Sequence, residues 1–147
     1  PPGLKHRWSS MRFSGFKVLA GQPSSKQSGD AAEDIALRHL QQAGLRLLVR
    51  NYRTPGRGGG EIDLVMRDGS EIAFIEVKTR RGDAAGRAEE SVSVSKGRKL
   101  LASGSWYLQQ HPAFGDPIWR IDLVAITLSR DGAVVRFNHI VNAVVSS

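Results

Sequence analysis

Residues 60–79 read GEIDLVMRDGSEIAFIEVKT, and this stretch decides the fold. As a strand, residues 61–66 place Ile62, Leu64 and Met66 on one face and Glu61, Asp63 and Val65 on the other. A second run, rich in β-branched and aromatic residues, covers 72–79. The segment Arg67-Asp68-Gly69-Ser70 between them is typical of a tight hairpin turn. The stretch therefore predicts two antiparallel strands joined by a short turn.

The register of this hairpin sets which acidic side chains meet. If Asp68 and Gly69 form a two-residue turn, Asp63 faces Phe74 and lies diagonally beside Glu76 on the same face. Their Cβ atoms are then within about 7 Å, close enough for both carboxylates to reach one cation. A shift of the turn by one residue is expected to place them on opposite faces.

The rest of the chain predicts an α/β fold. Apolar residues recur every three or four positions over 28–43, and Gly44 favours a helix end there. The expected elements are a helix at 28–43, strands at 45–53, 61–66 and 72–79, a helix at 95–110 capped by Ser95, a strand at 119–128, and one or two short strands within 133–145. This α-β-β-β-α-β-β order predicts a mixed sheet with helices packed against it.

Length and composition fit one folded unit preceded by a basic segment. The chain has 147 residues, which suits one domain, and its lack of cysteine excludes disulfides and thiolate chemistry. Residues 1–27 hold five of the 21 basic residues and none of the 14 acidic ones, without periodicity. We expect a disordered extension over 1–27 and a single domain over 28–147.

Charge and hydropathy favour a nucleic-acid partner and a cytoplasmic protein. The net charge is +7, and basic side chains cluster around the hairpin, among them Arg53, Arg57, Arg80, Lys96 and Arg98. Such clusters suit a polyanion, although they also fit a solvated surface. No apolar run approaches the roughly 18 residues of a membrane span. The acid-free start leaves an organelle transit peptide as an alternative.

Glu76 and Lys78 stand where an apolar pattern would not place them. Glu76 lies mid-strand between Ile75 and Val77, and a buried carboxylate is costly unless it is paired or binds a metal. Together with Asp63 it offers the oxygen ligands that Mg²⁺ prefers. Lys78, on the same side, can orient a water or stabilise charge developing on a phosphate. The alternative is a solvated strand face with cross-strand ion pairs.

Glu33 adds a third acidic side chain. A helical wheel places Glu33 with Leu37 and Leu40 toward the sheet, and Asp34 toward water. The alternative is structural, because Asp30 to Glu33 also fits a capping box at a helix start.

These motifs together resemble a known family. The chain resembles the YraN-like family, small uncharacterised proteins of the PD-(D/E)XK nuclease superfamily, distantly similar to archaeal Holliday junction resolvases. The matching pieces are Gly29-x-x-Ala32-Glu33, Asn51-Tyr52-Arg53, Gly60-Glu61-Ile62-Asp63-Leu64-Val65, Phe74-Ile75-Glu76-Val77-Lys78-Thr79-Arg80, Val94-x-Lys96 and Arg120-Ile121-Asp122-Leu123-Val124. The resemblance implies a three-layer, restriction-endonuclease-like core with a mixed central sheet flanked by helices.

The resemblance also implies a role for each site residue. Asp63, Glu76 and the Val77 backbone carbonyl would ligate Mg²⁺ or Mn²⁺. Lys78 would position the attacking water, and Glu33 would act through water or a second metal. The implied reaction is metal-dependent endonucleolytic hydrolysis of DNA phosphodiester bonds, with branched or structured DNA as a candidate substrate. A homodimer and a protein partner in a DNA repair complex are further expectations. Asp122 matches the family pattern, and we expect it either to be structural or to support the side chains that bind the metal.

Two other functions stay open at the level of the sequence. The chain can bind nucleic acid through its basic surface without turnover, or serve as a scaffold in DNA repair or processing. Other chemistries fit poorly, because no serine–histidine–aspartate arrangement, phosphate-binding P-loop or zinc-ligand spacing can be placed.

Overall fold

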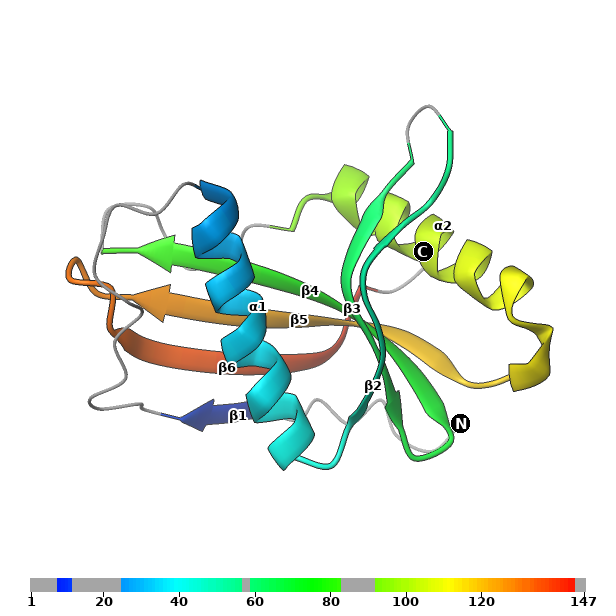
Figure 1. The fold of residues 1–147 in the computed structure, drawn as a ribbon, viewed down its shortest axis with the longest axis horizontal. Helices are drawn as coiled ribbons and strands as arrows, with labels where there is room; N and C mark the ends of the chain where they lie inside the picture. The colour runs from blue at the N-terminus through cyan, green and yellow to red at the C-terminus, as the bar shows by residue number, and fades with distance from the viewer. Residues whose placement is uncertain (1–7, 12–24, 57–58, 83–91, 145–147) are drawn as a thin grey trace.

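The computed structural model describes residues 8–11, 25–56, 59–82 and 92–144, with side chains from residue 29 onward (Figure 1). The elements are β1 (Trp8–Met11), α1 (Ser25–Gln42), β2 (Arg46–Arg53), β3 (Glu61–Asp68), β4 (Glu71–Arg81), α2 (Val94–Gln110), the short 3-10 helix η2 (Pro112–Phe114), β5 (Trp119–Leu128) and β6 (Val134–Val144). After β1, this order confirms the predicted α-β-β-β-α-β-β. In the described ranges, no helix combines the length and apolar character that a bilayer crossing requires.

The strands of the described ranges form one mixed sheet in the order β1-β6-β5-β4-β3-β2. β4 and β5 run parallel, whereas every other neighbouring pair is antiparallel. A parallel pair needs a long crossover connection, and the segment containing α2 supplies it. β4 therefore lies in the interior of the sheet, with β3 on one side and β5 on the other.

The two long helices cover opposite faces of this sheet. Leu40 of α1 belongs to one core cluster with Ile75 of β4. Leu100 and Tyr107 of α2 belong to a second cluster with Phe74 of β4. Since successive residues of a strand point to opposite faces, the two clusters lie on the two sides of the sheet. The predicted three-layer arrangement is confirmed, and α1 crosses in front of the central strands in the view of Figure 1.

The hairpin between β3 and β4 turns one residue later than predicted. Asp68 pairs with Glu71, which leaves Gly69 and Ser70 as the turn, and Gly69 has a positive φ of 61°. A Gly-X turn with positive φ at its first residue suits the twist of a hairpin as well as Asp-Gly does. Phe74 consequently pairs with Val65, so the predicted pairing of Asp63 with Phe74 is wrong.

This change of turn does not separate the two acidic residues. Moving a two-residue turn by one position moves each residue's partner by two, and a slip of two residues preserves the face of every side chain. The expectation that such a shift would place Asp63 and Glu76 on opposite faces is therefore wrong. The ladder ends at Leu64 and Ile75, and side-chain alternation breaks there, because Ile62 and Leu64 belong to different core clusters. Asp63 is instead held beside β4 by a hydrogen bond from the backbone N–H of Val77.

The start of α2 also differs from the prediction. Ser93, not Ser95, caps the helix, because its side chain accepts a hydrogen bond from the backbone N–H of Lys96 at 3.1 Å. Ser93 and Ser95 are equivalent candidates for the cap by residue type. The helix is capped by Ser93 and therefore begins at Val94.

The N-terminal region contains structure that the sequence did not predict. β1 pairs antiparallel with β6 along the sheet edge, and α1 begins at Ser25, so β1 and the first three residues of α1 lie within the segment 1–27 that was expected to lack order. A four-residue edge strand is held by backbone hydrogen bonds, which carry no side-chain pattern. The predicted end of α1 is confirmed, because Gly44 follows it with a φ of 100°. Of the one or two short strands expected near the C-terminus, the structure has one, β6 over Val134–Val144.

Two helical glycines allow a matched test of packing. A Cβ on the buried Gly104 of α2 would lie 2.9 Å from a ring carbon of Trp119 and 3.0 Å from two of Phe74, whereas a Cβ on Gly29 of α1 would meet nothing within 4 Å. We expect Gly104→Ala to lower the free energy of unfolding by about 1–3 kcal/mol. Gly29→Ala should raise it by about 0.5–1 kcal/mol through helix propensity. Urea denaturation measures both, and two changes of the same sign would contradict this packing.

Candidate functional site

The candidate site begins where the ladder between β3 and β4 stops. The last ladder pair is Leu64 with Ile75. Beyond it, Asp63 Oδ2 accepts a hydrogen bond from the backbone N–H of Val77 at 2.8 Å. A side chain thus takes the place that the next backbone partner of β4 would hold, and a polar gap opens between two strands that are otherwise apolar.

Glu76 occupies the β4 side of this gap and is only 5% exposed. Its Oε1 lies 3.5 Å from Nζ of Lys78 on β4 and 3.7 Å from Nζ of Lys96 on α2. Its Oε2 is buried without a hydrogen-bond partner. Leaving a buried acceptor unsatisfied costs about 1–3 kcal/mol of folding free energy. A hydrogen-bond donor or a cation that bound to this oxygen would recover that cost.

Asp63 carries a strongly perturbed carboxyl group. Burial, together with the charge of Glu76, raises the pKa of Asp63 to about 7, against the lowering effect of the Val77 hydrogen bond. Two carboxylates sharing a poorly solvated gap disfavour full ionisation of both. A bound divalent cation would reverse this preference, since it favours the carboxylate form.

The donor set fits a hard divalent cation. The N–H and C=O groups of one strand residue point to the same edge of the strand, so the Val77 carbonyl faces the same gap as its N–H. Carboxylate and carbonyl oxygens are the ligands that Mg²⁺ and Mn²⁺ favour. Within the described residues, no three acidic or histidine side chains form a closed cage. Asp63, Glu76 and the Val77 carbonyl would therefore share the ion with water.

Glu33 lies beside the gap in a second polar cluster. It is buried, as the helical wheel predicted, and it sits well inside α1, so the capping-box alternative is wrong. Its Oε1 lies 3.6 Å from Nε of Arg50, whose Nη1 donates to Asp34 at 2.6 Å. Burial raises the pKa of Glu33 despite Arg50, and the charge of Glu33 in turn helps to raise the pKa of Asp63.

Asn51 is a site residue whose role the sequence did not reveal. Its neighbours in β2, Arg50 and Tyr52, pair with residues on either side of Asp63, so Asn51 lies across from Asp63. Its φ of 54° is unusual for any residue but glycine. In the orientation that satisfies its neighbours, its amide donates to Glu33 at 2.8 Å and to Glu61 at 3.2 Å. The left-handed backbone of Asn51 thus places its side-chain amide between Glu33 and Glu61.

The residues predicted to bind nucleic acid lie in different surroundings. Arg53 has a 79% exposed side chain and lies 4.0 Å from Glu61, and Arg80 and Arg98 are also exposed. Lys96 is instead directed at Glu76. Arg57 lies outside the described residues. The exposed arginines remain available to a polyanion, whereas Lys96 belongs to the acidic site.

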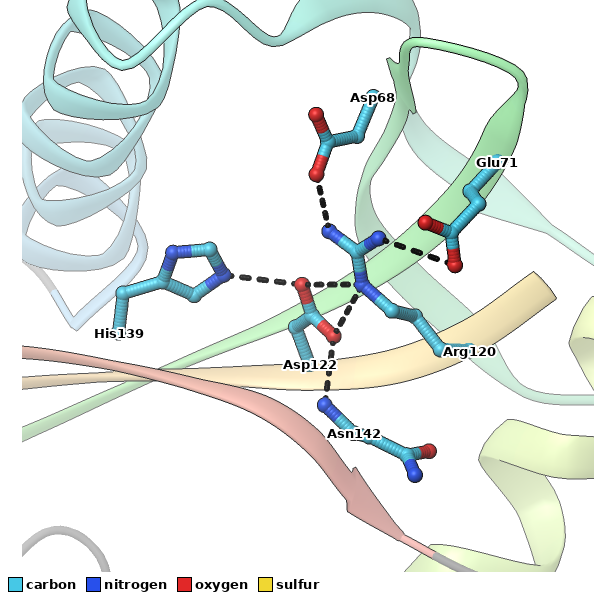
Figure 2. Close-up of polar contacts among 6 residues, drawn as sticks. All are labelled: Asp68, Glu71, Arg120, Asp122, His139 and Asn142. Atoms are coloured by element: carbon cyan, nitrogen blue, oxygen red, sulfur yellow. Dashed lines mark hydrogen bonds and ion pairs between the residues drawn. The ribbon is translucent and has the colours of Figure 1, made fainter. Parts of the chain in front are cut away.

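Asp122 anchors a separate buried network, shown in Figure 2. It is fully buried and accepts hydrogen bonds from Nε of Arg120 at 3.0 and 3.2 Å and from the backbone N–H of Asn142 at 2.9 Å, and it contacts Nε2 of His139 at 2.9 Å. Nη2 of Arg120 donates a hydrogen bond to Oδ2 of Asp68 at 2.9 Å. The network ties β5 and β6 to the β3–β4 turn, in keeping with the structural role expected for Asp122.

Comparison with known proteins places this arrangement in a family. The model of the uncharacterised protein family UPF0102 matches residues 32–126, which include Glu33, Asp63, Glu76, Lys78 and Lys96. The chain belongs to this family. The YraN-like membership expected from the motifs is thereby confirmed, while the family's description states no activity.

Three relatives in this family cover a range of sequence identity. A UPF0102 protein of Albidiferax ferrireducens is 60% identical over 89 residues, covering 59% of this chain and 69% of its own. One from Paracidovorax citrulli is 48% identical over 109 residues, covering 74% and 79%. One from Chloroflexus aurantiacus is 35% identical over 119 residues, covering 81% and 93%.

One solved structure is weakly similar. SfsA of Pyrococcus furiosus, solved in complex with Ca²⁺, is 16% identical with a TM-score of 0.40, and the match covers 79% of this chain and 64% of that one. A likeness at this level supports no inference about the activity or the metal of this chain.

The pKa of Asp63 gives the metal-free protein a pH-dependent stability. Between pH 4 and pH 7 the folded protein holds a proton that the unfolded chain has released, so the free energy of unfolding falls as pH rises through this window. Asp63→Asn keeps an acceptor for Val77 and removes the buried charge. With EDTA present at pH 8 it should raise the free energy of unfolding by on the order of 2 kcal/mol.

At pH 4 this gain should nearly vanish, because Asp63 is then protonated in wild type. Denaturant titrations at the two pH values measure the difference. Asp116→Asn, in the exposed turn before β5, is the control and should change little at either pH. A gain from Asp63→Asn that is equal at pH 4 and pH 8 would contradict the raised pKa.

Proposed function

We propose that this protein is a metal-dependent endonuclease that hydrolyses phosphodiester bonds in DNA. The observation that carries the proposal is the unpartnered buried Oε2 of Glu76, set beside Asp63 where the β3–β4 ladder stops. Asp63 has a structural use, because it accepts the Val77 N–H, but the buried Oε2 of Glu76 has no hydrogen-bond partner among the described residues and therefore no evident structural use.

Each residue of the site would have its own role around a bound Mg²⁺ or Mn²⁺. When bound, the ion would activate a water and offset the charge that develops on the phosphate. Asp63, Glu76 and the Val77 carbonyl would hold it. Lys78, whose Nζ lies beside Glu76, orients the attacking water and stabilises the phosphoryl oxygens. Glu33, whose pKa is raised, lies at the edge of the site and would accept a proton from the attacking water.

The surroundings of the site suit a DNA backbone. The chain has a net charge of +7, and the exposed Arg53, Arg80 and Arg98 can contact phosphates. Phosphate contacts of this kind give affinity that falls with salt and carries little sequence preference. The resemblance to Holliday junction resolvases makes four-way DNA the first structured substrate to test, beside flaps, duplex and single strands.

Cleavage of labelled DNA with Mg²⁺ or Mn²⁺ tests the proposal. Glu76→Gln should lower the rate by at least about 100-fold, because the amide replaces a charged metal ligand by a neutral one. Lys78→Met should lower it comparably while metal still binds. Glu71→Gln is the matched control, since the same substitution at the far end of β4 changes a half-exposed side chain that contacts Arg120.

Two results would contradict the proposal. Salt-sensitive DNA binding without metal-dependent cleavage by wild type would favour the non-catalytic binding protein. Cleavage that survives Glu76→Gln at the wild-type rate would show that it arises elsewhere, or from a contaminant. Loss of activity in Glu71→Gln as well would mean that folding of β4, rather than chemistry at Glu76, had been disturbed.

A further inference from the structure

Two lysines from different elements converge on one oxygen of Glu76. Lys78 extends from β4 itself, whereas Lys96 reaches across from the first turn of α2, and their Nζ atoms lie 3.5 and 3.7 Å from Oε1. Both side chains are 35% exposed, while that of Glu76 is 6% exposed. The carboxylate thus has two ammonium groups on its open side and an unpartnered oxygen on its closed side.

The first turn of α2 is fixed in the position that brings Lys96 to the site. Ser93 caps the helix through the Lys96 N–H, and the Gly97 N–H donates to the Ser93 carbonyl at 2.9 Å. Gly97 is buried, and a Cβ there would lie 3.1 Å from Val144 at the end of β6. The helix start is therefore held against the sheet, and Lys96 faces Glu76 because of where α2 begins.

We propose that Lys96 is the internal counter-ion of the metal site, and that a divalent cation bound at the free oxygen of Glu76 drives Lys96 away from the other oxygen. The inference rests on the proposed function and adds a role to it. An ammonium group beside a carboxylate opposes the approach of a second cation to that carboxylate. Lys96 is suited to leave, since it reaches Glu76 from a different element on a long flexible stem, and its ion pair at 3.7 Å is longer than that of Lys78 at 3.5 Å.

Displacement would make the freed ammonium available to substrate. Lys78 belongs to β4 and stays beside Glu76, whereas Lys96 can swing toward the open side, where a phosphate would lie. The same side chain would then hold the site together before metal binds and contact the DNA backbone afterwards. Lys96 would thereby oppose metal binding while it favours cleavage.

Titration of the full chain with Mn²⁺ alone tests this, read by calorimetry at low ionic strength. A unit charge about 5 Å from a divalent ion changes its affinity by about tenfold, so Lys96→Gln should tighten Mn²⁺ binding by about that factor. Lys96→Arg keeps the charge and should bind Mn²⁺ like wild type. Lys99→Gln, an exposed lysine on the same helix, should change the Mn²⁺ affinity less than about twofold. DNA cleavage should fall in Lys96→Gln.

The possible results distinguish the role of Lys96 from the proposed nuclease function. Mn²⁺ binding by wild type with no tightening, or with weakening, in Lys96→Gln would overturn the counter-ion role and leave the nuclease proposal standing. Absence of Mn²⁺ binding by wild type would overturn both. Equal tightening in Lys96→Gln and Lys96→Arg would also overturn the inference, because a change independent of charge would indicate altered packing at the start of α2.

Discussion

The site depends on the hydrogen bond from the Val77 N–H to the Asp63 carboxylate. It stands where the backbone ladder of β3 and β4 would otherwise continue, so it ends the pairing of two interior strands without exposing an unsatisfied donor. Because it draws Asp63 to β4, it also holds two acidic side chains close together between strands that are otherwise apolar. The raised pKa of Asp63 and the unpartnered oxygen of Glu76 both follow from that placement.

The electrostatics of this gap are unfavourable for the metal-free protein. Two carboxylates lie in poorly solvated surroundings, and the nearby ammonium groups of Lys78 and Lys96 contact one oxygen only. Asn51 adds a strained backbone beside Glu33. Strain and unsatisfied charge of this kind persist in folded proteins mainly where function requires them, and the surrounding core supplies the stability that offsets them.

Much of the fold followed from local patterns, and the site followed in part. Alternation predicted β3 and β4, and the predicted proximity of Asp63 to Glu76 holds although the predicted turn was wrong. The hydrogen bond from Val77 to Asp63 brings them together, and no strand pattern predicts it. The choice among Ser93 and its neighbours as the cap, and the existence of β1, were not predictable because several local solutions were equivalent. The contacts of Lys96 with Glu76 and of Asn51 with Glu33 join elements distant in the chain, and a single sequence contains no local signal for them.

The central claim is that a divalent cation binds between Asp63 and the free oxygen of Glu76. Anomalous diffraction from crystals soaked in Mn²⁺ tests it most directly. The account predicts one strong peak in the gap between β3 and β4, about 2.0–2.3 Å from an oxygen of each carboxylate, with Lys96 moved away from Glu76. Crystals in saturating Mn²⁺ that show no peak there, and both lysines still on Glu76, would contradict it.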